Sequence, residues 1–200
     1  ARFAERMKPE GTLIVCADSP GALRLGDARR AGGARVERYA VSPAASTQAE
    51  WQALNLRVNA DGAFDFTAVL DGSELGRVTL RVPGRHNVAN ALGALAMAMR
   101  AGVDFHRAAL AAAEFTGARR RFELVGEAAG VTVMDDYAHH PTEVRAMVSA
   151  ARQRFAGRRI VACFQPHTYS RSVYLLEGFK HCFEGLDALY VLRTYAAREE

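Results

Sequence analysis

The alternation of hydrophobic and polar positions predicts strands and helices that alternate at both ends of the chain, with an antiparallel meander between them. Residues 13–17 form a continuous apolar run, which is typical of a buried parallel strand. Asp61-Gly62 and Asp71-Gly72 each separate two strand-like runs and are strong hairpin signals. The predicted strands are residues 13–17, 35–41, 53–58, 64–70, 75–82, 121–126, 131–134, 159–164 and 188–192. The predicted helices are residues 1–8, 20–31, 86–100, 104–114, 141–155 and 173–183.

This order of elements predicts an α/β fold in two parts. The first part combines a strand–helix–strand unit with the meander and two further helices. From residue 131 onward strands and helices alternate, which indicates an open parallel sheet. A glycine-containing turn at 126–130 is the most suitable boundary, so we predict domains of residues 1–128 and 129–200.

The composition is that of an ordinary soluble, globular protein. The chain has 200 residues, of which 50% are apolar and 24% are charged, and these values exclude a disordered or fibrous chain. No apolar run approaches the ~18–20 residues that a membrane span needs, and no signal peptide opens the chain. We therefore expect no membrane partner.

The charge pattern does not favour a nucleic-acid partner. The 26 Lys and Arg residues exceed the 22 Asp and Glu residues, giving a net charge of +4. The basic residues are scattered among acidic ones, however, and only Arg119-Arg120-Arg121 forms a dense run. A nucleic-acid surface gathers basic residues on one face, with aromatic residues for stacking. We expect no nucleic-acid partner.

The three cysteines do not form a recognisable framework. Cys16, Cys163 and Cys182 are widely spaced and show no CxxC pair, so neither a zinc site nor a disulfide is indicated. Cys16 and Cys163 lie in apolar strand-like runs, where a buried free thiol is expected. Free thiols fit a reducing, cytoplasmic location.

Three polar clusters lie after a predicted strand or at the start of a predicted helix. Ligands gather at such places in α/β folds because strand ends and helix starts present free backbone N–H groups. The clusters are GRHNVAN (84–90), MDDYAHHP (134–141) and FQPHTYSRS (164–172). The sequence contains neither a GxxxxGK[ST] phosphate loop nor a GxGxxG fingerprint, and it shows no convincing Ser-His-Asp arrangement.

Each cluster has both a structural and a functional interpretation. Asn87 and Asn90 share a helix face and could match an adenine edge, or could only cap the helix. Asp135 and Asp136, with two histidines after them, could bind ribose, a metal or an anion, or could cap the next helix. Adjacent histidines are poor zinc ligands. Arg171 could bind a carboxylate or phosphate, or lie in a polar loop. The dense arginine run is either a solvated turn or a phosphate-binding element.

Taken together and in this order, four segments of the chain resemble motifs of the Mur ligase family. The segments are GRHNVANALGALAMA, RRRFELVGE, DDYAHHPTEV and FQPHTYSR. The resemblance covers essentially the whole chain and is weakest over residues 35–80. It implies the end of a P-loop-type ATPase central domain, which contains the antiparallel meander, followed by the start of a Rossmann-like parallel-sheet domain that binds the amino acid.

The resemblance also implies a reaction. In the family, ATP phosphorylates the carboxylate of a nucleotide sugar, and the amine of an amino acid attacks the acyl phosphate. The motifs imply L-alanine and UDP-N-acetylmuramate as substrates, ATP and Mg²⁺ as cofactors, and a role in cytoplasmic peptidoglycan precursor synthesis, in cell-wall biogenesis, cell shape and cell division. The oligomeric state is left open.

The resemblance further assigns roles to single residues, motif by motif. The nucleotide site would contain His86, Asn87, Asn90, Arg121, Asp135, Asp136 and Tyr137. Within it, Asn87 and Asn90 would lie on the adenine side and Asp135 would bind the ribose. Arg121 and His139 would take part in catalysis, Arg121 by reaching an ATP phosphate. The substrate-binding residues would be His139, His167 and Arg171, with Arg171 as the partner of the alanine carboxylate.

Two departures from the family pattern stand out. Thr168 stands where some members carry a second basic residue, so the carboxylate would depend on Arg171 alone. The phosphate loop, the Mg²⁺ ligands and the nucleotide-sugar domain would lie upstream of Ala1, and the last domain would continue past Glu200. We therefore expect an internal part of a longer ligase that is inactive alone, with no metal ligands of its own.

Two alternative functions stay open at this point. A related ligase attaches a murein tripeptide to the same nucleotide sugar, although the paired HHP and QPH motifs favour alanine. A non-catalytic nucleotide-binding module would keep the adenine and ribose residues without turnover. A Rossmann oxidoreductase is disfavoured because no glycine fingerprint follows any strand.

Overall fold

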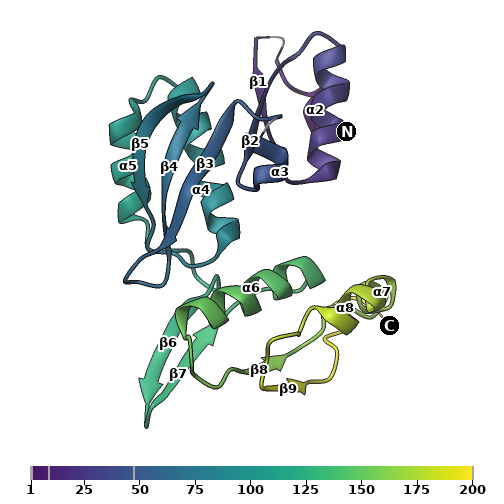
Figure 1. The fold of residues 1–200 in the computed structure, drawn as a ribbon. Helices are drawn as coiled ribbons and strands as arrows, with labels where there is room; N and C mark the ends of the chain where they lie inside the picture. The colour runs from purple at the N-terminus through teal and green to yellow at the C-terminus, as the bar shows by residue number, and fades with distance from the viewer. Residues whose placement is uncertain (1, 9, 47, 200) are drawn as a thin grey trace. The chain divides into compact units, whose positions relative to one another are not determined.

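A computed structural model describes residues 2–8, 10–46 and 48–199, which form two compact units (Figure 1). The first unit contains the chain up to Phe115 without Val82–Gly84. The second contains those three residues and the chain from Thr116 onward. The units therefore divide upstream of the predicted domain boundary between residues 128 and 129.

The first unit is built on a mixed five-stranded sheet with the strand order β1-β2-β3-β4-β5. Its strands are β1 (Thr12–Cys16), β2 (Arg35–Ala40), β3 (Trp51–Val58), β4 (Phe64–Leu70) and β5 (Ser73–Thr79). Its helices are α1 (Arg2–Glu5), α2 (Pro20–Ala31), α3 (Pro43–Ser46), α4 (Arg85–Arg100) and α5 (Phe105–Glu114). Strands β1, β2 and β3 are parallel, and β3, β4 and β5 are antiparallel. The predicted strand–helix–strand unit and meander are confirmed; α3 was not predicted.

The turn between β4 and β5 explains why the meander could be predicted. Asp71 and Gly72 both have positive φ angles, of 48° and 79°. Two central residues with positive φ make the two-residue turn whose twist matches a β-hairpin, and Asp-Gly is a preferred pair for it. The turn places Leu70 opposite Ser73, which fixes the register of the two strands.

Helices cover both faces of the parallel part of this sheet. In β1, Leu13 and Val15 pack with residues of α2, whereas Ile14 packs against the larger cluster that contains α4. Successive side chains of a strand point to opposite faces, so α2 and α4 lie on opposite sides. The predicted cap of α5 is confirmed, because the Asp104 carboxylate accepts a hydrogen bond from Arg107 N at 3.0 Å.

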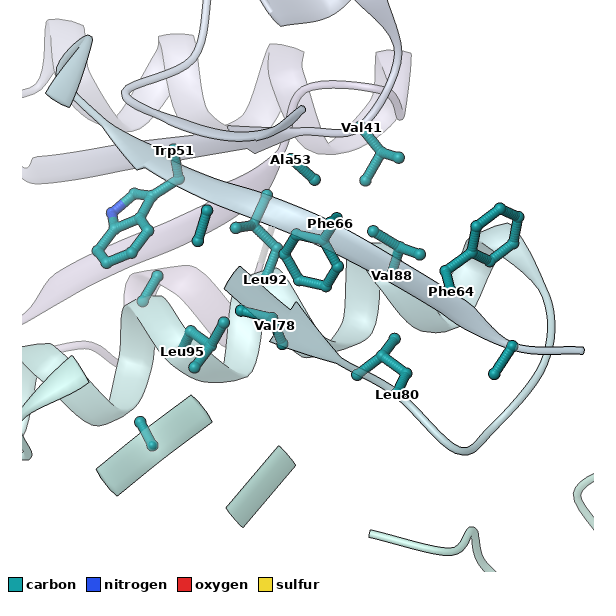
Figure 2. Close-up of a cluster of buried hydrophobic side chains, with 14 residues drawn as sticks. Val41, Trp51, Ala53, Phe64, Phe66, Val78, Leu80, Val88, Leu92 and Leu95 are labelled. Atoms are coloured by element: carbon teal, nitrogen blue, oxygen red, sulfur yellow. The ribbon is translucent and has the colours of Figure 1, made fainter. Parts of the chain in front are cut away.

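The main hydrophobic core joins the sheet to α4 and α5. Figure 2 shows large side chains of the strands meeting those of α4. The fully buried residues of this core include Trp51, Phe66, Val78, Leu80, Val88 and Leu92. The buried Glu37 carboxylate accepts a hydrogen bond from the Trp51 indole at 3.0 Å. The indole ring is therefore buried among apolar side chains while its N–H group keeps a hydrogen-bond partner. The core positions the start of α4, where the first polar cluster lies.

The second unit contains a two-stranded antiparallel sheet and a two-stranded parallel sheet. Its elements are β6 (Glu123–Ala128), β7 (Val131–Asp135), α6 (Pro141–Arg154), β8 (Val161–Phe164), α7 (Tyr169–Tyr174), α8 (Leu176–His181) and β9 (Ala188–Val191). The predicted helix 173–183 is two helices that meet at Leu175, and the first begins upstream at Tyr169. Val144, Val148 and Cys182 form the core of the unit.

The strand pairing of this unit differs from the single parallel sheet that the pattern indicates. β8 and β9 are parallel, as expected, but β7 pairs with β6 in an antiparallel hairpin. The two turn residues Ala129 and Gly130 have φ angles of 49° and 77°, a tight hairpin turn. Residues of both β7 and β8 line a cavity of about 710 Å³. The hairpin is also why the second unit begins before residue 128.

The cysteine prediction is partly wrong. Cys182 is buried, Cys16 is half-buried and Cys163 is exposed; all three are free thiols. Cys163 lies in β8, whose residues alternate between exposed and half-buried, and the strand places it on the exposed face. Among the described helices, none has the length and apolar character needed to cross a membrane.

The close packing at Gly76 gives a testable prediction. Gly76 has a φ of 145°, and a Cβ there would lie 2.9 Å from Cε1 of the Phe105 ring. We expect Gly76→Ala to lower the unfolding free energy of the first unit by about 1–3 kcal/mol, through backbone strain and overpacking. Urea unfolding followed by the fluorescence of Trp51, the single tryptophan, measures the unfolding free energy of this unit.

Gly21→Ala is the matched control, because a Cβ at Gly21 meets nothing within 4 Å. We expect its unfolding free energy to stay within about 0.5 kcal/mol of the wild type. An unchanged midpoint for Gly76→Ala would contradict the packing at this position.

Candidate functional site

The first polar cluster lies at the start of α4, as predicted. Asn90 Nδ2 donates a hydrogen bond to Asn87 Oδ1 over 3.1 Å, which confirms that the two amides share a helix face. Val88 and Leu92 hold the opposite face of the helix in the core. Asn87 is half-buried, and His86 and Asn90 are exposed. The pair presents amide donors and acceptors on one surface, the requirement for contact with a purine edge.

The other predicted residues lie in the second unit, where the arginine run forms a strained turn. Arg120 and Phe122 have φ angles of 56° and 53°, a left-handed backbone that is unfavourable for bulky residues. The Asp136 carboxylate stabilises this turn because it accepts hydrogen bonds from Phe122 N at 2.8 Å and Ala138 N at 2.7 Å. Asp136 therefore shapes the backbone on both sides of the site.

Asp135 ends β7 and faces the same turn. Its carboxylate accepts a hydrogen bond from Arg120 Nε at 3.2 Å, and the Asp135 side chain is 42% exposed. The Arg120 guanidinium also lies 4.7 Å from the centre of the Tyr137 ring, and Tyr137 N donates to Arg120 O at 2.8 Å. Of the two adjacent acids, Asp135 is the one whose carboxylate is open to a ligand.

The start of α6 organises the histidines of the second cluster. Pro141 stands at the first helical position and His140 is the N-cap, with Glu143 completing a capping box. The Glu143 carboxylate accepts hydrogen bonds from His139 N at 3.0 Å and His140 N at 3.3 Å. The helix start therefore fixes the backbone of both histidines.

Glu143 also meets the predicted phosphate-binding arginine. Arg121 NH1 lies 3.9 Å from Glu143 Oε1, and its side chain is 53% exposed. Burial alone raises the pKa of Glu143, but the His139 backbone donor, the His139 ring, the His140 donor and Arg121 outweigh it and hold the pKa below its usual value. Glu143 is thus an anion at neutral pH, and both Arg121 and the His139 ring lie within 4 Å of its carboxylate.

A chain of rings links the second and third clusters. The Tyr137 and His139 centroids are 5.3 Å apart, and those of His139 and His167 are 6.5 Å apart. His167 in turn stacks on Tyr195 at 5.3 Å. The structure therefore brings Tyr137 and His139 together with His167, which is distant from both in the sequence.

The two histidines differ in their polar partners. His139 Nδ1 lies 2.9 Å from the Tyr137 carbonyl and 3.6 Å from a Glu143 oxygen. Both neighbours are acceptors, so the Nδ1 proton is favoured and Nε2 is the nitrogen left to accept a proton. His167 Nδ1 is buried, and no described residue forms a hydrogen bond with it.

Arg171 lies in the first turn of α7, one turn after His167. Arg171 NH1 donates to the His167 carbonyl at 3.1 Å, and the residue is half-buried. A guanidinium has five N–H donors, so the group keeps donors for an acid. The half-buried guanidinium beside His167 therefore suits a small molecule that has a carboxylate or a phosphate group.

The sequence interpretation missed three residues of this region: Glu143, Arg120 and Tyr195. Glu143 has a local signal, since a glutamate at the third helical position after a cap is typical of a capping box. Tyr195 follows β9 as the other clusters follow their strands, and the same rule would have found it. Among the described residues, no three His, Cys, Asp or Glu side chains gather as a metal site would require.

The comparisons with known proteins agree on one family. The model of the Mur ligase middle domain matches residues 1–98, and that of the Mur ligase glutamate ligase domain matches residues 120–200. The predicted boundary between residues 128 and 129 lies inside the second match. The first match lies mainly in the first unit and the second lies in the second unit, and residues 99–119 lie between the two matches.

Single relatives point the same way. The UDP-N-acetylmuramate–L-alanine ligase of Mycolicibacterium gilvum is 45% identical over 203 residues, covering 100% of this chain and 42% of that protein. A crystal structure of the UDP-N-acetylmuramate–alanine ligase of Thermotoga maritima has a TM-score of 0.71 and 26% identity, over 91% of this chain and 37% of that one. A crystal structure of a murein peptide ligase from Psychrobacter arcticus has a TM-score of 0.58 and 25% identity, over 94% of this chain and 44% of that one. This chain spans about two fifths of the length of the curated relatives that it matches.

The role of Glu143 gives a prediction on pH dependence. Its pKa is lowered in the folded state, so its stabilising contribution is present above the unfolded pKa and is lost as the pH falls through the folded pKa. At pH 7 we expect Glu143→Gln to lower the unfolding free energy of the second unit by about 1 kcal/mol, the size typical of a lost helix cap. Thermal unfolding followed by circular dichroism measures it.

The difference from the wild type should shrink as the pH falls below the usual glutamate range and through the lowered pKa of Glu143. Glu184→Gln is the control, because Glu184 is 77% exposed and pairs only with His181 among the described ion pairs. A gap that stays constant down to pH 3, or no gap at pH 7, would contradict this role of Glu143.

Proposed function

The chain belongs to the Mur ligase family, and we propose that it forms the part of an ATP-dependent ligase that receives the adenosine of ATP and the amino acid L-alanine. The ligase joins L-alanine to UDP-N-acetylmuramate, a step of peptidoglycan precursor synthesis in the cytoplasm. The observation that carries the proposal is the grouping of Tyr137, His139 and His167 in the second unit. Arg171 follows His167 by one helical turn.

Each unit by itself carries residues that suit one part of the nucleotide. The amides of Asn87 and Asn90 suit the adenine edge, and the open Asp135 carboxylate suits the ribose hydroxyls. Within the first unit His86 would lie beside the adenine residues, and within the second Tyr137 would lie beside Asp135. Asp136 would act on the nucleotide mainly by shaping the backbone, because each of its oxygens accepts a hydrogen bond from a backbone N–H group.

The chemistry is mostly positioning and charge stabilisation. When bound, ATP would supply the phosphoryl group that activates the nucleotide-sugar carboxylate, and Mg²⁺ would screen the phosphates. Arg121, half-exposed beside Glu143, supplies positive charge for phosphate oxygens. His139 Nε2 would take the proton that the alanine ammonium must lose before it attacks.

The amino acid would bind between His167 and Arg171. The free donors of Arg171 suit the alanine carboxylate, and the aromatic surfaces around His167 suit a small apolar side chain. Thr168 offers a hydroxyl and no charge, so Arg171 would be the cation of the site.

A second candidate is ligation of a murein tripeptide to the same nucleotide sugar. It is supported by the similarity to the Psychrobacter arcticus structure, at 25% identity. The alanine reaction is favoured by 45% identity over the whole chain to an alanine ligase. A non-catalytic nucleotide-binding module would need only the adenine and ribose residues, and it would not explain the grouping of His139, His167 and Arg171.

The experiment uses the full-length protein that contains this chain, with UDP-N-acetylmuramate, ATP and an equimolar mixture of L-alanine and murein tripeptide. We expect ADP release that depends on L-alanine, with the alanyl product dominant in the mass spectrum. A dominant tripeptide product would favour the second candidate, and no ADP release with either would favour the non-catalytic module.

Arg171→Ala in the full-length protein should raise the KM for L-alanine by about 10²-fold, because a charge-assisted pair contributes roughly 1.5–3 kcal/mol. The KM for ATP should change by less than about twofold. Arg145→Ala in α6 is a control of equal charge change. An unchanged KM for L-alanine would remove Arg171 from the carboxylate site.

A further inference from the structure

The segment that follows β9 lies along the third polar cluster, although the sequence motifs do not include it. Leu192 N donates to Phe164 O and Tyr195 N donates to Pro166 O, both at 2.9 Å. Gln165 Nε2 donates to Arg193 O at 3.2 Å. Residues 192–199 therefore run beside the turn that joins β8 to α7.

Glu199 ends this segment with its carboxylate against the start of α7. Oε2 accepts a hydrogen bond from Ser170 N at 2.9 Å. Oε1 accepts hydrogen bonds from the hydroxyls of Thr168 and Ser170. Glu199 N donates to Ala196 O at 2.9 Å, which closes a turn behind the carboxylate.

These contacts replace a missing local cap. Thr168 is the N-cap residue of α7, and within the described part of the chain its side chain makes no capping hydrogen bond to the helix. The first backbone N–H groups of a helix need an acceptor, and an anion there is favoured by the helix dipole. The Glu199 carboxylate supplies that acceptor from 29 residues away in sequence.

We propose that Glu199 is a positioning residue for the amino-acid site: it holds the turn of residues 167–170 and thereby sets His167 and Arg171. The proposal rests on the function proposed above. His167 and Arg171 bracket the residues that Glu199 contacts, and Arg171 donates back to the His167 carbonyl at 3.1 Å. Loosening the turn would therefore move the imidazole and the guanidinium together.

The charge state agrees with this role. The hydroxyl donors of Ser170 and Thr168 and the Ser170 N–H lower the pKa of Glu199 to about 2. The carboxylate is therefore an anion at neutral pH. Some family members carry a basic residue at the position of Thr168. Here the Thr168 hydroxyl donates a hydrogen bond to the Glu199 carboxylate.

Hydrogen exchange of the full-length protein tests the contact itself. In Glu199→Gln, the amide side chain cannot replace both accepting oxygens, and we expect the amides of residues 167–172 to exchange about tenfold faster. Glu177→Gln is the matched control, since Glu177 is 81% exposed and pairs with Lys180 in α8. Exchange in Glu199→Gln that equals the wild type would overturn the proposal.

Kinetics test the positioning role. We expect Glu199→Gln to raise the KM for L-alanine about tenfold while the KM for ATP stays within about twofold. Ser170→Ala should cost much less when added to Glu199→Gln than in the wild type, because both changes break the same contact. An unchanged KM for L-alanine in a variant with faster exchange would overturn the positioning role.

A wild-type protein that ligates no amino acid would be a different failure. It would overturn the proposed function and the substrate role of Glu199 with it, whereas the exchange rates would still decide whether Glu199 orders the turn.

Discussion

The carboxylate of Glu143 is the interaction on which the arrangement of the second unit's site depends. It accepts the N–H groups of His139 and His140, starts α6, and lies 3.9 Å from Arg121. Without that anion, the start of α6 would lose its cap and Arg121 would lose its ion-pair partner. The backbone of His139, whose ring lies near that of His167, would no longer be fixed. One side chain thus connects the residues proposed for phosphate and amino acid.

Carboxylates that accept backbone N–H groups recur wherever the proposed site needs a fixed turn. Asp136 stabilises the strained turn around Phe122, and Glu199 caps α7. In each case the anion offsets unsatisfied N–H donors, so the neighbouring arginines and imidazoles keep their remaining donors and acceptors for a ligand. This division of labour suits a ligase, because its chemistry depends mainly on placing charges correctly.

The local features could be predicted from the sequence, and the distant ones could not. Helix α2 has its predicted bounds because a serine cap and Gly32-Gly33 delimit it, and the hairpin at Asp71-Gly72 follows from its turn residues. Polar residues after strands predicted two clusters whose rings the structure brings near one another in the second unit, and their roles stay a prediction. The pairing of β7 with β6 is also local, but its Ala129-Gly130 turn is a weaker hairpin signal than Asp-Gly. The contact of Glu199 with Ser170 joins segments that are distant in the sequence and carry no signal for each other.

The most direct test of the account follows an oxygen atom. If the full-length protein activates UDP-N-acetylmuramate as an acyl phosphate, a carboxylate oxygen attacks the terminal phosphorus of ATP and leaves as part of phosphate when the alanine amine attacks. With ¹⁸O in that carboxylate, the account predicts one ¹⁸O atom in each inorganic phosphate formed with L-alanine, measured by mass spectrometry. Unlabelled phosphate alongside the alanyl product would contradict it.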